Sequence, residues 1–139
     1  MWADIGYMLI AGWLSISLFY TAVITPSAFK GIPSDKVGDF LGLVFPKYYK
    51  WGMVFFLVSF AIFLFSREYI QSFLSFIGFL FMIFAEILRI RIRKTRMQLR
   101  ENPADTELKR LFVDLHRFSA YCNFTSLTAS VLIIVLKWF

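Results

Sequence analysis

Four long stretches of the chain contain no charged residue, and this feature limits the fold more than any other. They are residues 5–24, 51–66, 69–85 and 118–136, and each is 16 to 20 residues long. An α-helix needs about 20 apolar residues to cross the hydrocarbon core of a bilayer, with about 17–25 tolerated. Helices satisfy their own backbone hydrogen bonds in lipid, and the alternating strands of a barrel do not occur in this sequence. The sequence therefore predicts an all-α integral membrane protein, a four-transmembrane-helix bundle.

The composition agrees with this class of protein. Hydrophobic residues make up 59% of the 139 residues and aromatic residues 20%, which is far above the usual content of a soluble domain. The length is that of one domain, so we expect a single membrane domain over residues 1–139. Its spans are expected at about 5–25, 48–66, 69–92 and 111–137. The first residues lack a basic region and a small-residue cleavage site, so the first span is expected to be retained.

The basic residues are distributed asymmetrically about these spans. Thirteen of the 15 Lys and Arg lie in or beside the first and third connections, whereas Arg67 and Lys137 lie on the other side. The positive-inside rule then places both odd-numbered loops in the cytoplasm and both termini outside, in the cell inner (plasma) membrane. This orientation and attraction to anionic lipid headgroups account for the net charge of +6, so we expect no nucleic-acid partner.

The first connection is predicted to have structure of its own. Pro26, in "TPSAF", is expected to end or kink the first helix near the cytoplasmic surface. The segment 35–45 then has helical periodicity, with apolar residues on one face and charged residues on the other. It predicts a short interfacial amphipathic helix that Pro46 ends. This helix is expected to be a structural elbow, and a gate or partner-docking element is the alternative.

The third span is predicted to continue beyond the membrane. No helix breaker follows it until Asn102, so one helix is expected from about Tyr69 to about Arg100. It overshoots a core about 30 Å thick and forms, with the last helix, an extended cytoplasmic helix 3–helix 4 hairpin. Asn102 is expected to cap the last helix, with Asp105 at its third position. Four arginines form a basic stripe expected to face Asp105, Glu107 and Asp114 and to contact lipid headgroups: Arg89, Arg93, Arg96 and Arg100.

The last helix carries polar residues on one stripe. Phe112, His116, Ser119 and Asn123 fall on one helical face. Polar groups in hydrocarbon turn toward partners, so His116 is expected to point into the bundle. With a turn at 101–102, Glu86 comes opposite His116 or Arg117, and it is the one acidic residue well inside a span. Glu86 and His116, with Ser119 and Asn123, are therefore candidates for binding or gating. The alternative, equally open for these residues, is hydrogen-bonded packing.

Three motifs resemble a known family. They are "TPSAF" at 25–29, "FPKYY" at 45–49 and F-x-x-x-H-x-x-S-x-x-x-N at 112–123. With four spans in this order, they resemble the DUF4149 family of transmembrane protein 205-like proteins. The resemblance covers nearly the whole chain and implies a four-helix integral membrane protein, but no established activity. The family positions that it carries over include four further binding or gating candidates: Pro26, Tyr48, Tyr49 and Phe112.

Two functions fit these features. The first is transport or permeation of a small solute or metal ion through a polar intramembrane site around His116, acting as proton-responsive ligand or gate. Because four spans enclose little lumen, this function would need a homo-oligomer. The alternative is a non-transport accessory or scaffold subunit of a larger membrane complex, which would dock through the amphipathic segment and the hairpin.

An enzyme is disfavoured by the absence of characteristic motifs. The sequence has no HExxH, CxxC, nucleotide-binding loop or paired catalytic carboxylates. Cys122 is the single cysteine, which allows no internal disulfide and no thiolate cluster. We therefore expect no resident cofactor. A metal ion would use His116, and a haem would need His116 from each of two chains.

Overall fold

The computed structural model describes residues 1–138, apart from the side chains of residues 34 and 35. Helices make up nearly all of this region, and it contains no strand. Its elements are α1 (Trp2–Phe19), the π-helix η1 (Tyr20–Ile24), α2 (Thr25–Gly31), α3 (Ser34–Phe65), α4 (Tyr69–Glu101) and α5 (Thr106–Leu136). Because α1, η1 and α2 follow one another without a break, the chain forms four rods. Each rod is long and apolar enough to cross a membrane, which confirms the predicted four-transmembrane-helix bundle.

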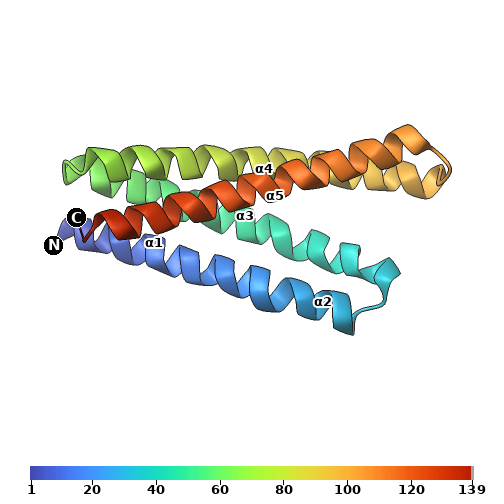
Figure 1. Ribbon diagram of the computed structural model, residues 1–139, viewed down its shortest axis with the longest axis horizontal. Helices are drawn as coiled ribbons and strands as arrows, with labels where there is room; N and C mark the ends of the chain where they lie inside the picture. Colours follow the sequence, from blue (N-terminus) through green and yellow to red (C-terminus); the bar gives the residue numbers. More distant parts are fainter. Residues whose placement is uncertain (139) are drawn as a thin grey trace.

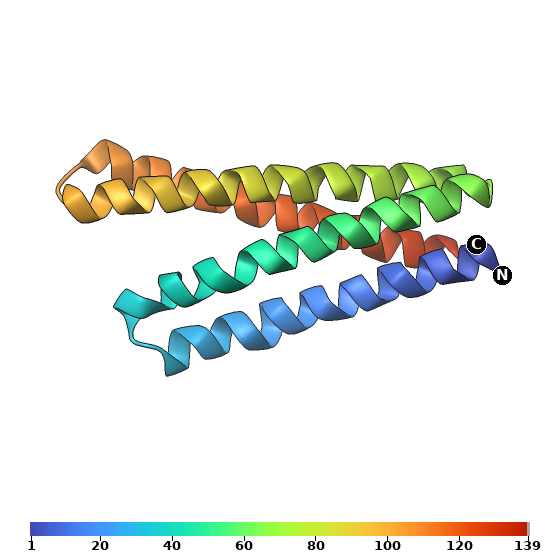
Figure 2. The same cartoon turned by 180° about the vertical axis from the view of Figure 1, so that it is seen from behind.

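The four rods form two helical hairpins, and the turns of both hairpins lie at the same end of the bundle. Both termini and the α3–α4 turn lie at one end of the bundle, and the α2–α3 and α4–α5 connections lie at the other (Figures 1 and 2). We call this second end the hairpin end. Helices α1 and α4 each pack against α3 and α5, whereas the described parts of α3 and α5 lie across the bundle without backbone contact. The α4–α5 hairpin extends beyond the α2–α3 connection (Figure 1).

Pro26 is expected to end or kink the first helix, and it does not end it. The five-residue π-helix η1 precedes it, and the Thr25 N–H donates to Tyr20 O at the end of this segment. Proline lacks an N–H, and its ring clashes with the carbonyl four residues earlier in an α-helix. A π turn changes this register, which lets the rod continue through Pro26 to Gly31.

The predicted interfacial helix is helical but is not a separate element. The segment 35–45 forms the first turns of α3, which continues through Pro46 as one helix of 32 residues. The prediction that Pro46 ends a short helix is therefore wrong. Pro46 removes one backbone hydrogen bond, but the tyrosines that follow it are buried in the bundle, and this packing keeps the helix continuous.

The long third rod is confirmed, and the cap of the last helix differs from the expectation. Helix α4 runs unbroken for 33 residues, about 50 Å at 1.5 Å per residue, where one helix from about Tyr69 to about Arg100 is predicted. Helix α5 is capped by Asp105, not by Asn102: the Asp105 carboxylate accepts a hydrogen bond of 3.0 Å from the Leu108 N–H. The α4–α5 turn therefore lies further along the chain, and the register between the two helices moves by about one helical turn.

The α3–α4 turn is a Schellman motif with an unusual residue in its left-handed position. The Glu68 N–H donates to Phe63 O at 2.9 Å, and the Arg67 N–H donates to Leu64 O at 3.2 Å. Arg67 has a φ of 62°, where glycine is the usual residue because a Cβ is disfavoured there.

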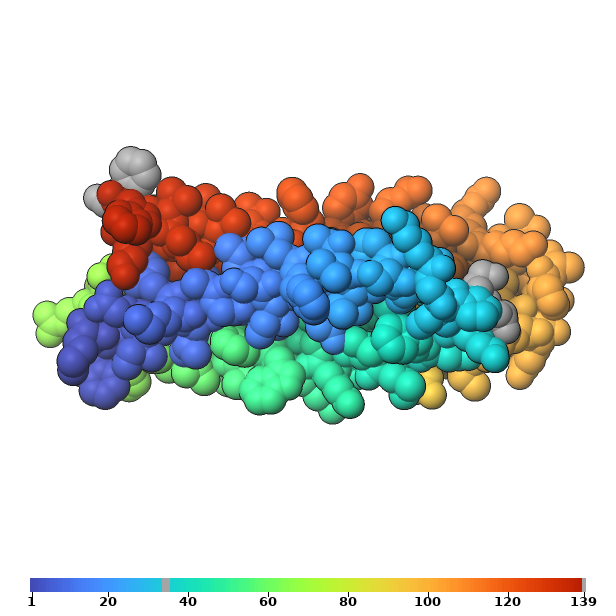
Figure 3. Space-filling model, turned by 90° about the horizontal axis from the view of Figure 1, so that it is seen from below, coloured from blue at the N-terminus to red at the C-terminus, as the bar shows by residue number. Residues whose placement is uncertain are grey.

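Large side chains and small residues alternate in the core. Glycines give the rings room: a Cβ on Gly78 would clash with the Phe56 ring, and one on Gly52 would lie 2.7 Å from Met82 Sδ. Such small residues let membrane helices approach closely. Figure 3 shows the bundle from the side on which α1 and α2 lie. The largest fully buried side chains are Ile10, Trp13, Phe56, Phe63, Met82 and Ile133.

Candidate functional site

Two adjacent tyrosines of α3 form the centre of the candidate site. Tyr48 and Tyr49 are only 3% and 4% exposed, and consecutive helical residues diverge by about 100°. The Tyr48 hydroxyl donates to Asn123 Oδ1 of α5 at 3.1 Å and lies 3.0 Å from Ser17 Oγ of α1. The Tyr49 hydroxyl lies 3.3 Å from Ser119 Oγ, also on α5. Four of these five residues are sequence-predicted candidates.

We call these five residues the hydroxyl cluster: Ser17, Tyr48, Tyr49, Ser119 and Asn123. The cluster joins α1, α3 and α5 in the interior of the bundle. The described parts of α3 and α5 make no backbone contact, and the two tyrosine side chains bridge them. Every member has a hydrogen-bond partner, which removes the penalty of burying a polar group unsatisfied. The cluster therefore takes the place of direct helix packing at this level.

Aromatic rings orient the two tyrosines. The centroids of the Trp13 and Tyr20 rings lie 4.8 and 5.0 Å from that of Tyr48, and the Phe45 ring stacks on Tyr49 at 5.8 Å. Aromatic pairs of this kind contribute about 0.5–1.5 kcal/mol beyond burial alone. Packing thus sets the direction of both hydroxyl groups before any ligand binds.

Glu86 is paired within its own helix. Arg89 donates from Nε and Nη2 to the two carboxylate oxygens of Glu86, at 2.7 Å each, and the side chains are 18% and 17% exposed. The prediction that Glu86 meets His116 is wrong for two reasons. A guanidinium one turn along the same helix already reaches the carboxylate in a bidentate geometry. The α4–α5 register also differs by about one turn from the one expected.

His116 does not point into the bundle, so this part of the prediction is also wrong. The side chain is exposed, and the described residues provide no hydrogen bond to it. Its ring lies parallel to that of the half-buried Phe112, with centroids 6.4 Å apart. The buried face of α5 carries Ser119, Cys122 and Ser126. Continued toward the hairpin end with helical spacing, this face reaches Leu115, and His116 is rotated from it by about 100°.

Two further candidates, Pro26 and the half-buried Phe112, lie outside the hydroxyl cluster. Pro26 is exposed at the start of α2. Within residues 1–138 the structure brings together no group of three His, Cys, Asp or Glu side chains that could hold a metal ion. The arrangement of described residues that could act chemically is the hydroxyl cluster, which can donate and accept hydrogen bonds.

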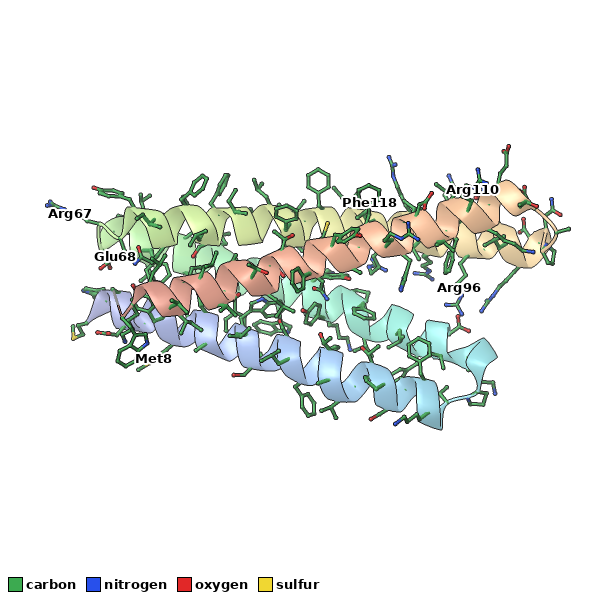
Figure 4. The ribbon with its side chains drawn as sticks, in the orientation of Figure 1. Met8, Arg67, Glu68, Arg96, Arg110 and Phe118 are labelled. Atoms are coloured by element: carbon green, nitrogen blue, oxygen red, sulfur yellow. The ribbon has the colours of Figure 1, made fainter. Side chains whose placement is uncertain are left out.

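Two arginines of the basic stripe of α4 pair with α3, and the described residues show no ion pair from the stripe to α5. Arg100 Nη2 lies 3.1 Å and Arg96 Nη2 3.8 Å from Asp39 Oδ1, and a Cβ on Gly38 would clash with the Arg96 guanidinium. Figure 4 shows Arg96 extending from α4 toward the start of α3. The expected pairing with acidic residues of the last helix is not found among the described residues. Of the four arginines, Arg93 is exposed and makes none of these ion pairs.

Ser17 and Asp39 contact the candidate residues, and the sequence-based reasoning did not name them as site residues. Ser17 is one of several serines and threonines in the first span. The sequence around it gives no signal that this serine faces the tyrosines. Asp39 belongs to the charged face of the segment 35–45, and this position was a usable signal because a carboxylate there faces the headgroup region where the arginines emerge.

The comparisons with known proteins identify a family but no activity. A family model described as "Domain of unknown function (DUF4149)" matches residues 8–102. This match contains "TPSAF", "FPKYY" and both tyrosines of the hydroxyl cluster, and it ends before the motif of the last helix. No curated protein and no solved structure matches the chain.

Proposed function

The chain belongs to the DUF4149 family, and from this premise we propose that it is a multi-pass membrane protein for transport or permeation of a small polar solute or ion. The solute would pass along the hydroxyl cluster. The single observation that carries the proposal is the cluster itself: five hydrogen-bonding side chains from α1, α3 and α5 meet in the interior of the bundle.

Simple packing of membrane helices does not require such a group. Close contacts between helices in lipid are made by small residues, and this bundle has several of them, among them Gly52 and Gly78. At the hydroxyl cluster, two large phenols cross the bundle where α3 and α5 do not touch. Interhelical hydrogen bonds in membrane proteins contribute only about 0.6 kcal/mol on average, so a polar solute could exchange for them at small cost.

Charged and titratable groups lie on the hairpin side of the cluster. His116 precedes Ser119 by three residues on α5, about 4.5 Å along the axis, and the Glu86–Arg89 pair is half-buried on α4. His116 is exposed at this level, and it would act as the proton-responsive gate at the mouth of the path. A metal-ion cargo would use His116 from more than one chain, in a homo-oligomer.

The proposed orientation follows from charge. Thirteen of the 15 Lys and Arg lie toward the hairpin end, so the positive-inside rule places this end in the cytoplasm and both termini outside the inner (plasma) membrane. Exposed arginines such as Arg93 would then face anionic lipid headgroups.

The test is a flux assay in proteoliposomes with protons, monovalent cations and divalent metal ions as separate solutes. The double variant Tyr48→Phe and Tyr49→Phe keeps both rings and removes both hydroxyls. We expect its flux to fall about tenfold, because ~1.4 kcal/mol of lost stabilisation along the path corresponds to that factor. Tyr121→Phe is the matched control, since Tyr121 is 61% exposed. Wild-type flux no higher than that of empty liposomes for every solute would refute the proposal.

The second variant to test is His116→Ala. Since His116 is exposed, its removal should leave folded yield unchanged. If His116 is the gate, flux through the variant should no longer depend on pH. Flux that keeps its pH dependence in this variant would remove His116 from the mechanism while leaving the hydroxyl cluster in place.

A non-transport accessory or scaffold subunit is the second candidate. One observation favours it: Met97, Leu111 and Val113 are exposed apolar side chains, at 58%, 46% and 51%, in the part of the α4–α5 hairpin that overshoots the membrane. Apolar side chains outside the lipid suit a protein partner. A partner that co-purifies in mild detergent, and that Leu111→Glu releases, would support this function.

A further inference from the structure

An open groove of about 440 Å³ lies on the surface of the bundle between α1 and α3. Its described lining contains one cation, no carboxylate and a wall of aromatic rings: Trp13, Tyr20, Lys47, Tyr48, Trp51 and Phe55. Membrane helices usually close such gaps with their own side chains. A groove of this size is therefore a place where a ligand from the bilayer can lie.

The groove runs along the bundle axis and has its charge at one end. Helix α1 and helix α3 are antiparallel, so Tyr20 and Lys47 lie toward the hairpin end and Trp13 and Phe55 deeper in the bundle. From Lys47 to Phe55 is about 12 Å along α3. From Lys47 to the end of α3 at Phe65 is about 27 Å, close to the thickness of a hydrocarbon core of about 30 Å. Lys47 therefore lies at the depth of lipid headgroups.

The chemistry of the wall changes along this direction. Apolar ring faces complement a hydrocarbon chain, and an ammonium group at headgroup depth complements a phosphate. Trp13 is fully buried, whereas Ile16 and Trp51 are 39% and 60% exposed. These two exposed side chains present apolar surface to a chain that lies in the groove.

We propose that this groove is a specific binding site for an anionic phospholipid, with an acyl chain along the aromatic wall and the phosphate on Lys47. The site goes beyond the proposed transport function and does not depend on it. It shares one residue with the hydroxyl cluster, because the Tyr48 ring lines the groove while its hydroxyl belongs to the cluster.

The first experiment measures quenching of Trp13 fluorescence by lipids with brominated chains. Trp2, Trp51 and Trp138 are replaced by phenylalanine, and the protein is placed in vesicles of phosphatidylcholine with added brominated phosphatidylglycerol or brominated phosphatidylcholine. We expect stronger quenching by the phosphatidylglycerol at equal mole fraction. Lys47→Gln should lower this preference about fivefold, the factor that corresponds to one basic residue at a membrane surface.

Two further variants separate the site from general surface attraction. Lys50→Gln removes a neighbouring exposed lysine that does not line the groove, and it should retain the preference. Ile16→Phe fills the groove from the α1 side, because Ile16 lines it and is 39% exposed. It should lower quenching by both lipids, since it removes the space for the chain while Lys47 stays in place.

Several results would overturn the proposal. They are an unquenched Trp13, an equal loss of preference in Lys47→Gln and Lys50→Gln, and a preference for phosphatidylcholine. A dimer in which crosslinks from Trp51→Cys join two copies through the groove would also overturn it. If the single-tryptophan variant does not fold, native mass spectrometry of the wild-type protein replaces it. Lys47→Gln, but not Lys50→Gln, should then lose a retained phosphatidylglycerol, and equal retention by both would contradict the site.

Discussion

Replacing Tyr48 by phenylalanine should destabilise the bundle by about 1–2 kcal/mol. The change keeps the ring, and therefore the packing against Trp13 and Tyr20. It removes the hydroxyl that lies 3.0 Å from Ser17 Oγ and 3.1 Å from Asn123 Oδ1. Hydrogen bonds between membrane helices contribute about 0.6 kcal/mol each on average, and a buried acceptor left without its donor adds to that loss.

The measurement is the free energy of unfolding in mixed micelles, from the change in helical circular dichroism as a denaturing detergent is added. Tyr121→Phe is the control, because Tyr121 is 61% exposed and its hydroxyl makes none of the side-chain hydrogen bonds found among the described residues. It should change stability by less than ~0.5 kcal/mol. A double-mutant cycle of Tyr48→Phe with Ser17→Ala should give a coupling of about 0.6 kcal/mol. A Tyr48→Phe variant as stable as Tyr121→Phe would refute the role assigned to the cluster.

Three further changes test other parts of the bundle. Arg67→Gly should raise the free energy of unfolding by about 1 kcal/mol, because it relieves a left-handed backbone position; no gain would contradict the turn geometry. Gly78→Ala should lower the free energy of unfolding by about 1–2 kcal/mol through a clash with Phe56. Gly42 has open space around it, so Gly42→Ala should not lower this free energy. Equal effects of the two changes would contradict this packing. A cysteine at Asp105, in a background without the native cysteine, should resist impermeant thiol reagents in intact cells; ready labelling would reverse the proposed orientation.

Local properties of the sequence are sufficient for the class of fold. Uncharged stretches of 16 to 20 residues set the four spans, because burying an unpaired charge in lipid is costly and the position of each charge can be read directly from the sequence. The long α4 is predictable for a similar reason, since no breaker interrupts it before Asn102. The behaviour of the two prolines is not predictable in this way, because the rods continue through both of them. At Pro26 a π turn compensates for the loss of one backbone hydrogen bond, and at Pro46 the burial of the following tyrosines does so.

The candidate site was predicted in part. The motifs identify Tyr48, Tyr49, Ser119 and Asn123, but not that the tyrosines reach across the bundle to α5 and to Ser17 on α1. Partner choice depends on how each helix is rotated and on its register along the axis. A difference of one residue rotates a side chain by about 100°, and a difference of four moves it by a full turn of about 6 Å.

His116 and Glu86 show the consequence of these small displacements. Helical phase groups His116 with Ser119 and Asn123, but the packing of α5 buries the adjacent face and leaves the imidazole exposed. The α4–α5 turn at Asp105 moves the register by about one turn, and Glu86 binds Arg89 on its own helix. The sequence by itself determines that the chain crosses the membrane four times and which residues are polar inside it. Only the tertiary structure decides which of these residues meet, because rotation and register come from contacts among all four rods.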